Sequence, residues 1–410
     1  MLATKPEKTR KDDLHTGHPY WLRTRGTSVR VRATPGEGRF DVIVVGAGIS
    51  GALLAEVLTR AGKRVLILDR RAPVRGSTLA STAMIQHEMD VSLIDLRAER
   101  GRAAADAAWQ RSVRAVNDLL ALVADLGLDC GMAHKPALYL SGDQMDADAL
   151  MEETKARQKI GIAAEYLDRN RLRADYGINR AAAILSQDSA SANPAQLAAG
   201  LLRVVQKRGA VIASPVEVTD VGELPGGVAL STREGHVLVA EHAVFCTGYE
   251  FLMQMRAPSH HVTSTWALAT KPIMDLPQWL RDTIVWEAAE PYLYFRSDPT
   301  GRIIAGGEDE EAAEKNTSKS VLQQKTKRIL KKLEATTGLT VGRAENRWAA
   351  PFSVTEDGLP IIDRAKGHDR VFAVMGFGGN GITFSVIAAQ IVAAALTGKE
   401  DPDANLFRLR

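Results

Sequence analysis

The stretch DVIVVGAGISG, residues 41–51, decides the fold of this chain. It joins a short apolar run, which is typical of a buried parallel strand, to a glycine-rich turn. A helix and a second apolar strand that ends at Asp69 follow. The pattern therefore predicts a strand–helix–strand unit, with a strand at 41–45, a turn at 46–51, a helix at 52–60 ended by Gly62, and a strand at 65–68.

The glycine-rich turn is suited to binding a dinucleotide, and each residue type has a physical role there. Gly46 permits the tight turn, Gly48 lets the backbone approach a pyrophosphate, and Gly51 lets the helix pack closely on the sheet. The helix N-terminus offers free N–H groups and a partial positive charge to phosphates. Asp69 would accept a hydrogen bond from ribose hydroxyls. The alternative is a strand–helix turn without a ligand.

Length and composition exclude several classes of protein. The chain has 410 residues, enough for two or three domains of roughly 150 residues each. Its 45% of apolar and 25% of charged residues exclude collagen-like, low-complexity and wholly disordered chains. Its 2 cysteines exclude a disulfide framework and a CxxC-type zinc site, so we expect no metal site and a reducing compartment. A formal net charge of +3 gives no reason to expect nucleic acid as a partner.

The sequence also bears on membrane association and localisation. No run of about 18 uninterrupted apolar residues exists, so no transmembrane helix is expected. The polar leader lacks the apolar core and the small-residue cleavage site of a secretory signal, so cytoplasmic localisation is expected. Residues 1–37 are expected to form a flexible arm, with Tyr20, Trp21 and Leu22 as an anchor.

Glycine-rich loops near both ends of the chain favour one long cofactor, FAD, over NAD. In simple NAD dehydrogenases the nucleotide domain is contiguous, whereas here a second loop at 376–381 precedes a C-terminal helix. The alternative for that loop is a mobile segment before a surface helix. We expect an α/β fold with a discontinuous Rossmann-like FAD-binding domain at 38–115, 185–258 and 340–410, and a smaller α+β substrate domain with a mixed sheet at 116–184 and 259–339.

Eight segments in a fixed order, over about residues 40 to 395, carry a family resemblance. They include GSTLASTAMIQHE, AVFCTGYE, YLYFRSDPTGRIIAGGED and GFGGNGITFS. The sequence resembles the FAD-dependent D-amino-acid oxidase, glycine oxidase and sarcosine oxidase family, and within it the amine-oxidising branch that includes gamma-glutamylputrescine oxidase. The first segment is generic to flavoproteins with two dinucleotide-binding motifs, whereas the order of all eight is specific.

The resemblance implies which residues bind FAD. It assigns the pyrophosphate to Gly46, Gly48, Ile49, Ser50 and Gly51, and the adenosine to Asp69, Arg70 and Val216. It assigns the phosphates and ribityl chain to Ser77, Thr78, Ser81 and Thr82, and the flavin ring to Ala83, Met84, Ile85 and Gln86. It assigns to Thr247 and Gly248 the turn that closes over the FAD. It assigns the pyrimidine edge of the flavin to Gly378, Gly379, Asn380, Gly381, Ile382 and Thr383. Some members attach FAD through a cysteine near the C-terminal glycine loop. No cysteine lies beyond Cys246, so non-covalent FAD is expected.

The segment YLYFR, residues 292–296, is the main candidate for the substrate side. Its alternation as a strand would place Tyr292, Tyr294 and Arg296 on one face, over the flavin. His87, Tyr292 or Tyr294 would take the proton of the amine. The alternatives are a half-exposed strand for 292–296 and a purely structural role for His87.

The stretch 349–357 departs from the family pattern. Amino-acid oxidases of the family hold the substrate carboxylate with an arginine there, and this chain has none. Arg296, or else Arg347, would have to receive a carboxylate. An amine, or an N-substituted amino acid bound another way, therefore fits better than a simple amino acid.

The sequence thus predicts an FAD-dependent oxidoreductase that oxidises a C–N bond by hydride transfer to flavin N5. Its expected partner is a small amine or amino-acid substrate, and an oligomer or an electron-acceptor partner stays open. One alternative is a flavin dehydrogenase of a hydroxy acid or a polyol phosphate. Another is a partner-dependent FAD-binding subunit that uses the basic helix expected at 318–336 and the N-terminal arm.

Overall fold

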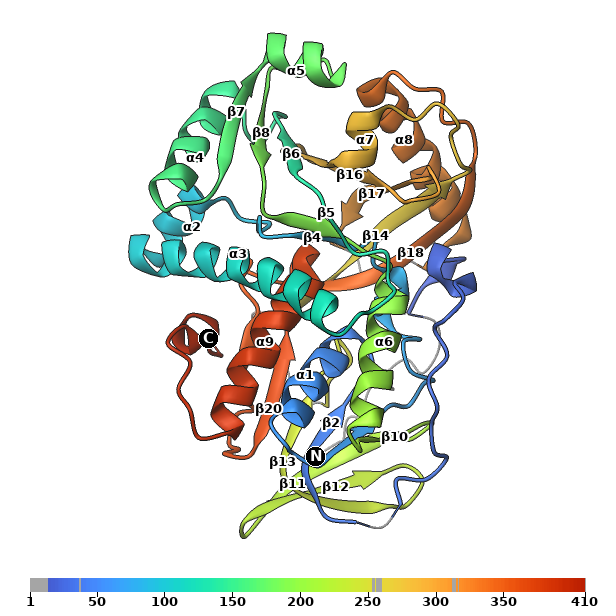
Figure 1. Ribbon diagram of the computed structural model, residues 1–410, viewed down its shortest axis with the longest axis vertical. Coiled ribbons are helices and arrows are strands. Elements are labelled where there is room, and N and C mark those ends of the chain that lie inside the picture. Colours follow the sequence, from blue (N-terminus) through green and yellow to red (C-terminus); the bar gives the residue numbers. More distant parts are fainter. Residues whose placement is uncertain are drawn as a thin grey trace, which may run out of the picture.

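The computed structural model describes residues 14–36, 38–252, 255, 260–311, 315 and 317–409. An eight-stranded sheet occupies the lower half of Figure 1 and a nine-stranded sheet the upper half. A three-stranded sheet of β4 (Met84–Gln86), β9 (Ser189–Ser191) and β5 (Ala133–His134) lies between them. Residues 1–13 and 37 of the expected arm, and residues 253, 254 and 256–259 of the segment that leads to His260, lie outside the described residues. In the described part of the arm, Thr16 and Gly17 pair with Ala349 and Trp348, and Trp21 is buried.

The lower sheet is the predicted Rossmann-like sheet. Its parallel strands are β10 (Val211–Ala213), β3 (Val65–Leu68), β2 (Phe40–Val45), β13 (Val237–Phe245) and β20 (Val371–Met375). The hairpin of β11 (Val218–Leu224) and β12 (Gly227–Thr232) and the strand β19 (Ile361–Arg364) extend it in antiparallel fashion. The inner strands are apolar because both of their faces are buried. β13 is one continuous strand that pairs with β2, β12 and β20.

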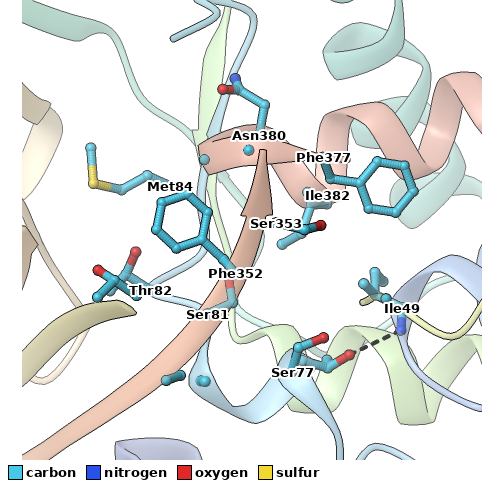
Figure 2. Close-up of a pocket in the computed structure, with 18 of the residues that line it drawn as sticks. Ile49, Ser77, Ser81, Thr82, Met84, Phe352, Ser353, Phe377, Asn380 and Ile382 are labelled. Atoms are coloured by element: carbon cyan, nitrogen blue, oxygen red, sulfur yellow. Dashed lines mark hydrogen bonds between the residues drawn. The ribbon is translucent and has the colours of Figure 1, made fainter. Parts of the chain in front are cut away.

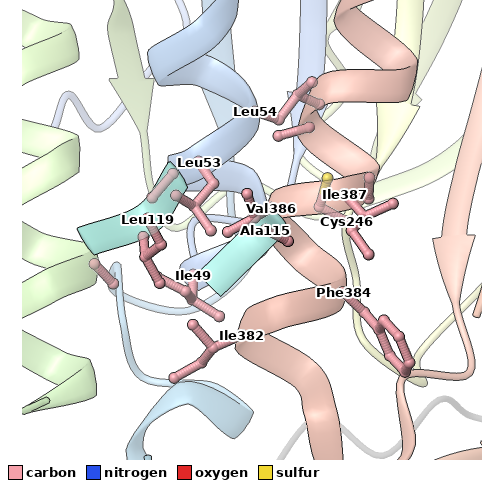
Figure 3. Packing of buried hydrophobic residues seen from close by; sticks show 14 of the residues in the cluster. Ile49, Leu53, Leu54, Ala115, Leu119, Cys246, Ile382, Phe384, Val386 and Ile387 are labelled. Carbon is pink, nitrogen blue, oxygen red and sulfur yellow. The ribbon is translucent and has the colours of Figure 1, made fainter. Parts of the chain in front are cut away.

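Three helices cover one face of this sheet, and the expected helix after the glycine turn is among them. They are α1 (Ile49–Arg60), α6 (Pro194–Lys207) and α9 (Gly381–Leu396). Figure 3 shows Leu53 of α1 and Val386 of α9 packed together, with Leu119 of α3 (Arg102–Asp125) beside them. This contact fixes the start of α9, and with it the C-terminal glycine loop, next to the start of α1.

Residues 378–396, which include α9, are long and apolar enough to cross a membrane, with a mean hydropathy of 1.6. The helix is instead surrounded by protein, because 72% of that stretch is buried inside the molecule. It packs on α1 and α3, so its composition is that of a core helix.

The upper sheet is mixed, as predicted. Its order is β1 (Thr16–Gly17), β18 (Ala344–Thr355), β14 (His260–Thr270), β17 (Ile303–Glu310), β16 (Leu293–Ser297), β15 (Ile284–Glu287), β6 (Ala137–Leu140), β8 (Ala182–Ser186) and β7 (Ala164–Asp168). Only the β15–β6 pair among these is parallel. β18 pairs with β14 along nearly its whole length, so residues 344–355 belong to this sheet and the expected boundary at 340 is wrong.

The remaining helices cover this upper part of the molecule. They are α2 (Leu93–Arg100), α4 (Ala147–Lys159), α5 (Arg169–Tyr176), α7 (Gln278–Asp282) and α8 (Lys319–Thr337). The basic helix expected at 318–336 corresponds to α8. α8 packs on β17, β14 and β18, so its apolar side is covered by the sheet.

A fully buried ion cluster joins α4 to the segment that follows β4. Arg157 donates from Nη1 to Glu88 Oε1 at 2.8 Å and from Nε to Glu153 Oε1 at 2.9 Å. Its guanidinium carbon lies 4.6 Å from the centre of the Trp109 ring. All three charged side chains have no exposed surface. The cluster therefore holds Glu88 in a fixed position at the junction of the two large sheets.

We expect Arg157→Ala to lower the free energy of unfolding by about 3–5 kcal/mol, because it leaves two buried carboxylates without their cation. Urea unfolding followed by circular dichroism measures the change. Lys155→Ala, on the same helix, removes an exposed ion pair with Glu152 and should change the free energy by less than about 0.5 kcal/mol. Equal effects of the two substitutions would contradict the structural role of the cluster.

Candidate functional site

Two adjoining cavities form one groove at the carboxyl ends of the parallel strands. The first cavity has a volume of about 220 Å³ and the second about 110 Å³. They share six lining residues, namely Gly48, Ser77, Thr78, Cys246, Gly248 and Tyr249. A groove in this place, where the connections of an α/β sheet diverge, is the usual ligand site of such a fold.

The glycine turn brings three pieces of backbone into close contact at the centre of the groove. A Cβ atom at Gly46 would overlap the carbonyl of Cys246, and one at Gly51 would overlap the carbonyl of Gly46. Gly48 lines both cavities, and a Cβ atom there would lie 3.0 Å from Thr78 Oγ1. Gly46 and Gly51 are thus required by packing, whereas Gly48 leaves the turn open to a ligand.

The start of α1 faces the groove. Ile49 N donates to Thr78 Oγ1 at 3.0 Å, the bond marked in Figure 2. The same figure labels lining residues of the first cavity from segments that are distant in sequence. They contribute Ile49 and Ser50, residues 77–84, Phe352 and Ser353, and residues 377–382. Helix N-termini bind anions through their free N–H groups, so a phosphate-bearing ligand fits here.

The second cavity has the features of a nucleoside site. Asp69 Oδ2 accepts from Ala47 N and Oδ1 from Arg71 N, each at 2.8 Å, which fixes the carboxylate at the end of β3. Burial raises the pKa of Asp69. Thr247 Oγ1 and Tyr249 Oη are buried in the wall of the groove, and neither has a partner among the described residues. Buried polar atoms are normally hydrogen-bonded, so both atoms fit a polar ligand in the groove.

Most of the sequence-predicted cofactor residues line this groove. The first cavity includes Gly48, Ile49, Ser50, Ser77, Thr78, Ser81, Thr82, Met84, Gln86, Gly248, Gly378, Gly379, Asn380, Gly381 and Ile382. The second includes Gly46, Asp69, Arg70, Val216 and Thr247. Gly51, Ala83, Ile85 and Thr383 do not line it. Thr383 instead donates to Gln86 O at 2.8 Å, and Ala83 is buried with a φ of 51°.

Alternation along residues 84–90 decides which side chains reach the first cavity. Met84, Gln86, Glu88 and Asp90 all line it, as expected for successive even positions of an extended segment. His87 faces the other way and is fully buried, with Nδ1 2.8 Å from Asp188 O. Burial also lowers the pKa of His87. The prediction that His87 takes the substrate proton is therefore wrong.

The two tyrosines of the YLYFR segment do reach the first cavity. Tyr292 and Tyr294 line it with ring centres 5.7 Å apart. Tyr292 Oη donates to Asp309 Oδ2 at 2.5 Å. Burial raises the pKa of both phenols, and it raises the pKa of Asp309 to about 6.

Arg296 lies behind the wall of the first cavity, so its prediction as a substrate ligand is wrong. Its Nε donates to Thr82 O and its Nη2 to Ala192 O, both at 2.8 Å. Only 2% of its surface is exposed, and it lines a different cavity. The strand alternation was right, but the backbone at Thr82 comes between Arg296 and the tyrosines. Arg347, the other predicted cation, is exposed and does not line the first cavity.

The first cavity has an acidic wall. Asp90 Oδ2 accepts from Gly379 N at 2.8 Å, and its carboxylate lines the cavity without an ion pair to any described residue. Glu88 is also in the wall, but it accepts from Arg157 and from Trp286 Nε1. Among the described residues that line this cavity, none is a lysine or an arginine.

Several lining residues were not predicted from the sequence, namely Glu88, Asp90, Tyr249, Thr265, Trp286 and Phe377. Tyr249 directly follows the predicted turn at Thr247, and Asp90 continues the alternation that begins at Met84. Both could therefore have been found from the motifs. Trp286 carried no such signal, because it reaches the cavity through the pairing of β15 with β6. Trp348 is a core residue that donates from Nε1 to Ala80 O, whereas Phe352 lines the cavity.

Comparisons with known proteins agree with this geometry. A family model described as FAD dependent oxidoreductase (DAO) matches residues 41–395. A putative Rieske 2Fe-2S iron-sulfur protein, YhfW, of Bacillus subtilis is 21% identical over 372 residues, which cover 90% of this chain and 70% of the relative. A glycine oxidase of Geobacillus kaustophilus is 24% identical over 382 residues, which cover 88% of this chain and 94% of the relative.

A solved structure shows the same fold. The crystal structure of glycine oxidase from Geobacillus kaustophilus superposes with a TM-score of 0.78 and 21% identity. The superposition covers 91% of this chain and 99% of that one. The likeness therefore extends over both large sheets of the molecule.

We expect Gly48→Val to abolish the retention of FAD while the fold survives. The φ of Gly48 is −88°, which other residues adopt, but the added side chain would fill the groove at the start of α1. The flavin absorbance of the purified protein, measured against its protein absorbance, reports the loss. Gly222→Val is a matched control, since a Cβ atom there meets nothing within 4 Å. A normal flavin content in Gly48→Val would show that the phosphates lie elsewhere.

Proposed function

This chain belongs to the DAO family of FAD-dependent oxidoreductases, and we propose that it oxidises a C–N bond of a cationic amine that lacks a carboxylate beside the reacting carbon. The observation that carries the proposal is the charge of the first cavity. Asp90 presents a carboxylate to the cavity, and no described lining residue is a lysine or arginine that could form an ion pair with a substrate carboxylate.

The groove supports an assignment of FAD along its length. The pyrophosphate would lie at Gly48 and Ile49, where the N–H groups at the start of α1 are directed. The adenosine would occupy the second cavity near Asp69, and the ring system would occupy the first cavity between residues 77–84 and 378–382. When bound there, FAD would accept the hydride that leaves the substrate carbon. The reacting nitrogen would first give up one proton to Tyr292 Oη, while the proton of Tyr292 passes to Asp309.

The carboxylates favour one charge of substrate. An ammonium group near Asp90 gains a charge-assisted hydrogen bond, which is stronger than a bond between neutral groups. The carboxylate of an amino acid in the same place would meet Asp90 without a compensating cation, and like charges disfavour binding. The cavity thus selects by repulsion as well as by attraction.

Tyr292 and Asp309 provide an acceptor for a substrate N–H. Because Tyr292 Oη donates its proton to Asp309, its oxygen lone pairs are left for a donor inside the cavity. An amine bound by Tyr292 would be oriented between the tyrosine face and the Asp90 side of the cavity. Orientation of this kind is the main contribution that the protein makes to hydride transfer.

The alternative functions are less well supported by these contacts. A hydroxy acid or a polyol phosphate carries an anionic group, for which the described wall of the first cavity has no cation. A partner-dependent subunit has no specific observation in its favour, because the apolar side of α8 is already covered by β14, β17 and β18.

We expect linear amines and diamines to bleach the flavin under anaerobic conditions, and glycine, lactate and glycerol phosphate to leave it oxidised. Asp90→Asn should lower kcat/KM for the best amine by about 10- to 150-fold, because the loss of a charged hydrogen bond costs about 1.5–3 kcal/mol. Steady-state rates at several substrate concentrations measure this change.

The control for this substitution is Asp125→Asn, at the end of α3, where the side chain is exposed. It should leave kcat/KM unchanged. Equal bleaching by glycine, together with an unaffected Asp90→Asn enzyme, would rule out a cavity selective for cations. No bleaching by any substrate in the absence of a second protein would favour the partner-dependent alternative.

A pH dependence follows from Asp309, whose pKa is raised to about 6 by burial. Above that pH the carboxylate is charged and attracts a cationic amine, and below it the group is neutral. We expect kcat/KM to fall as the pH is lowered through about 6, and this limb to be lost in Asp309→Asn. Glu311→Gln, at an exposed neighbouring position, should keep the limb. An unchanged limb in Asp309→Asn would assign it to another group.

A further inference from the structure

A third cavity, of about 810 Å³, lies on the opposite side of the wall that contains Ser81 and Thr82. We call it the basic cavity. Its charged lining residues are the cations Arg23, Lys135, Arg281 and Arg296, the titratable His134, and the acids Asp282 and Asp298. It shares no lining residue with the groove. Nothing in the proposed oxidation uses it.

Two of its cations are buried and form no direct ion pair, although Asp298 attracts both of them at longer range. Lys135 has 9% of its surface exposed and Arg296 has 2%. Neither forms an ion pair with a carboxylate of the described chain, and both donate to the carbonyl of Ser297. Burial and the nearby charge of Arg296 lower the pKa of Lys135 to about 8, and burial lowers that of Arg296 to about 10. Buried charges are normally paired, so this arrangement is costly without an anion.

The acids of the basic cavity do not meet this need. Asp298 Oδ2 accepts from Tyr20 Oη at 2.7 Å, and Oδ1 accepts from Thr300 N at 2.9 Å and Arg302 N at 3.0 Å. Asp282 accepts from the side chain of Gln278 through both of its oxygens. The carboxylates are thus bonded to their own neighbours, and the cavity keeps an excess of positive charge.

We propose that the basic cavity is a second ligand site, which takes a small molecule bearing a carboxylate or a phosphate. The anion would accept hydrogen bonds from the free N–H groups of Lys135 Nζ and of the Arg296 guanidinium, each of which has donors beyond those used by backbone carbonyls. The site is distinct from the FAD groove and does not depend on the proposed substrate.

A ligand in the basic cavity can affect the bound flavin through the wall between the two sites. Trp21 Nε1 donates to Ser81 O at 2.7 Å, and Arg296 Nε donates to Thr82 O at 2.8 Å. Ser81 and Thr82 also line the first cavity. An anion that draws Arg296 toward the basic cavity changes the bond that holds Thr82, so binding should alter the visible absorbance of the bound flavin.

The test is isothermal titration calorimetry of the FAD-loaded protein with inorganic phosphate and, separately, with succinate. We expect at least one of them to bind with a dissociation constant of about 1 mM or lower. Lys135→Met should weaken that binding at least tenfold, and Lys135→Arg, which keeps the charge, should weaken it by less than about threefold. Lys271→Met, at an exposed position, should have no effect.

The flavin content of each variant shows that the fold is intact, because Lys135 does not line the groove. Binding of phosphate alone would identify the ligand as a phosphate compound, and binding of succinate alone would identify it as a carboxylate. Absence of heat with both anions up to about 10 mM, or equal affinity of wild type and Lys135→Met, would overturn the proposal.

Discussion

The close contact of three backbone segments at the turn after β2 is the constraint on which the rest of the structure depends. Only glycine fits at positions 46 and 51, because a side chain at either would overlap a neighbouring carbonyl. The contact places the first residues of α1, Ile49 and Ser50, in the wall of the groove. Since α9 packs on α1, the same contact also fixes the loop at 378–382, more than 300 residues further along the chain.

The wall formed by Ser81 and Thr82 separates charges of opposite sign. The first cavity has Asp90 and Glu88 in its lining and no cation among its described residues, whereas the basic cavity behind it has Lys135 and Arg296. Charges of one sign in a low-dielectric site raise the affinity for ligands of the other sign. The two cavities therefore favour different ligands, although only the backbone segment at Ser81 and Thr82 separates them.

The sequence was sufficient for the elements with strong local signals. The βαβ unit and the C-terminal glycine loop followed from glycine positions and apolar runs, because these are properties of single segments. Most of the other groove residues followed from the family resemblance. The errors at His87 and Arg296 had another cause. His87 occupies an odd position in a segment whose even positions line the cavity. Arg296 is on the same strand face as Tyr292 and Tyr294, but the backbone at Thr82 separates it from the cavity, which only the assembled sheets reveal. The assignment of β18 to the upper sheet likewise depends on a long-range partner, β14.

The groove is assembled from segments that are far apart in the sequence and belong to both sheets. A ligand that contacts all of them binds the folded chain and has no equivalent site in the unfolded one. Such a ligand adds about 2.7 kcal/mol to stability when its free concentration is a hundred times its dissociation constant. The amount of this protein that persists in a cell should therefore depend on the supply of the flavin precursor, and a shortage of riboflavin should lower protein abundance before it lowers the activity of the molecules that remain.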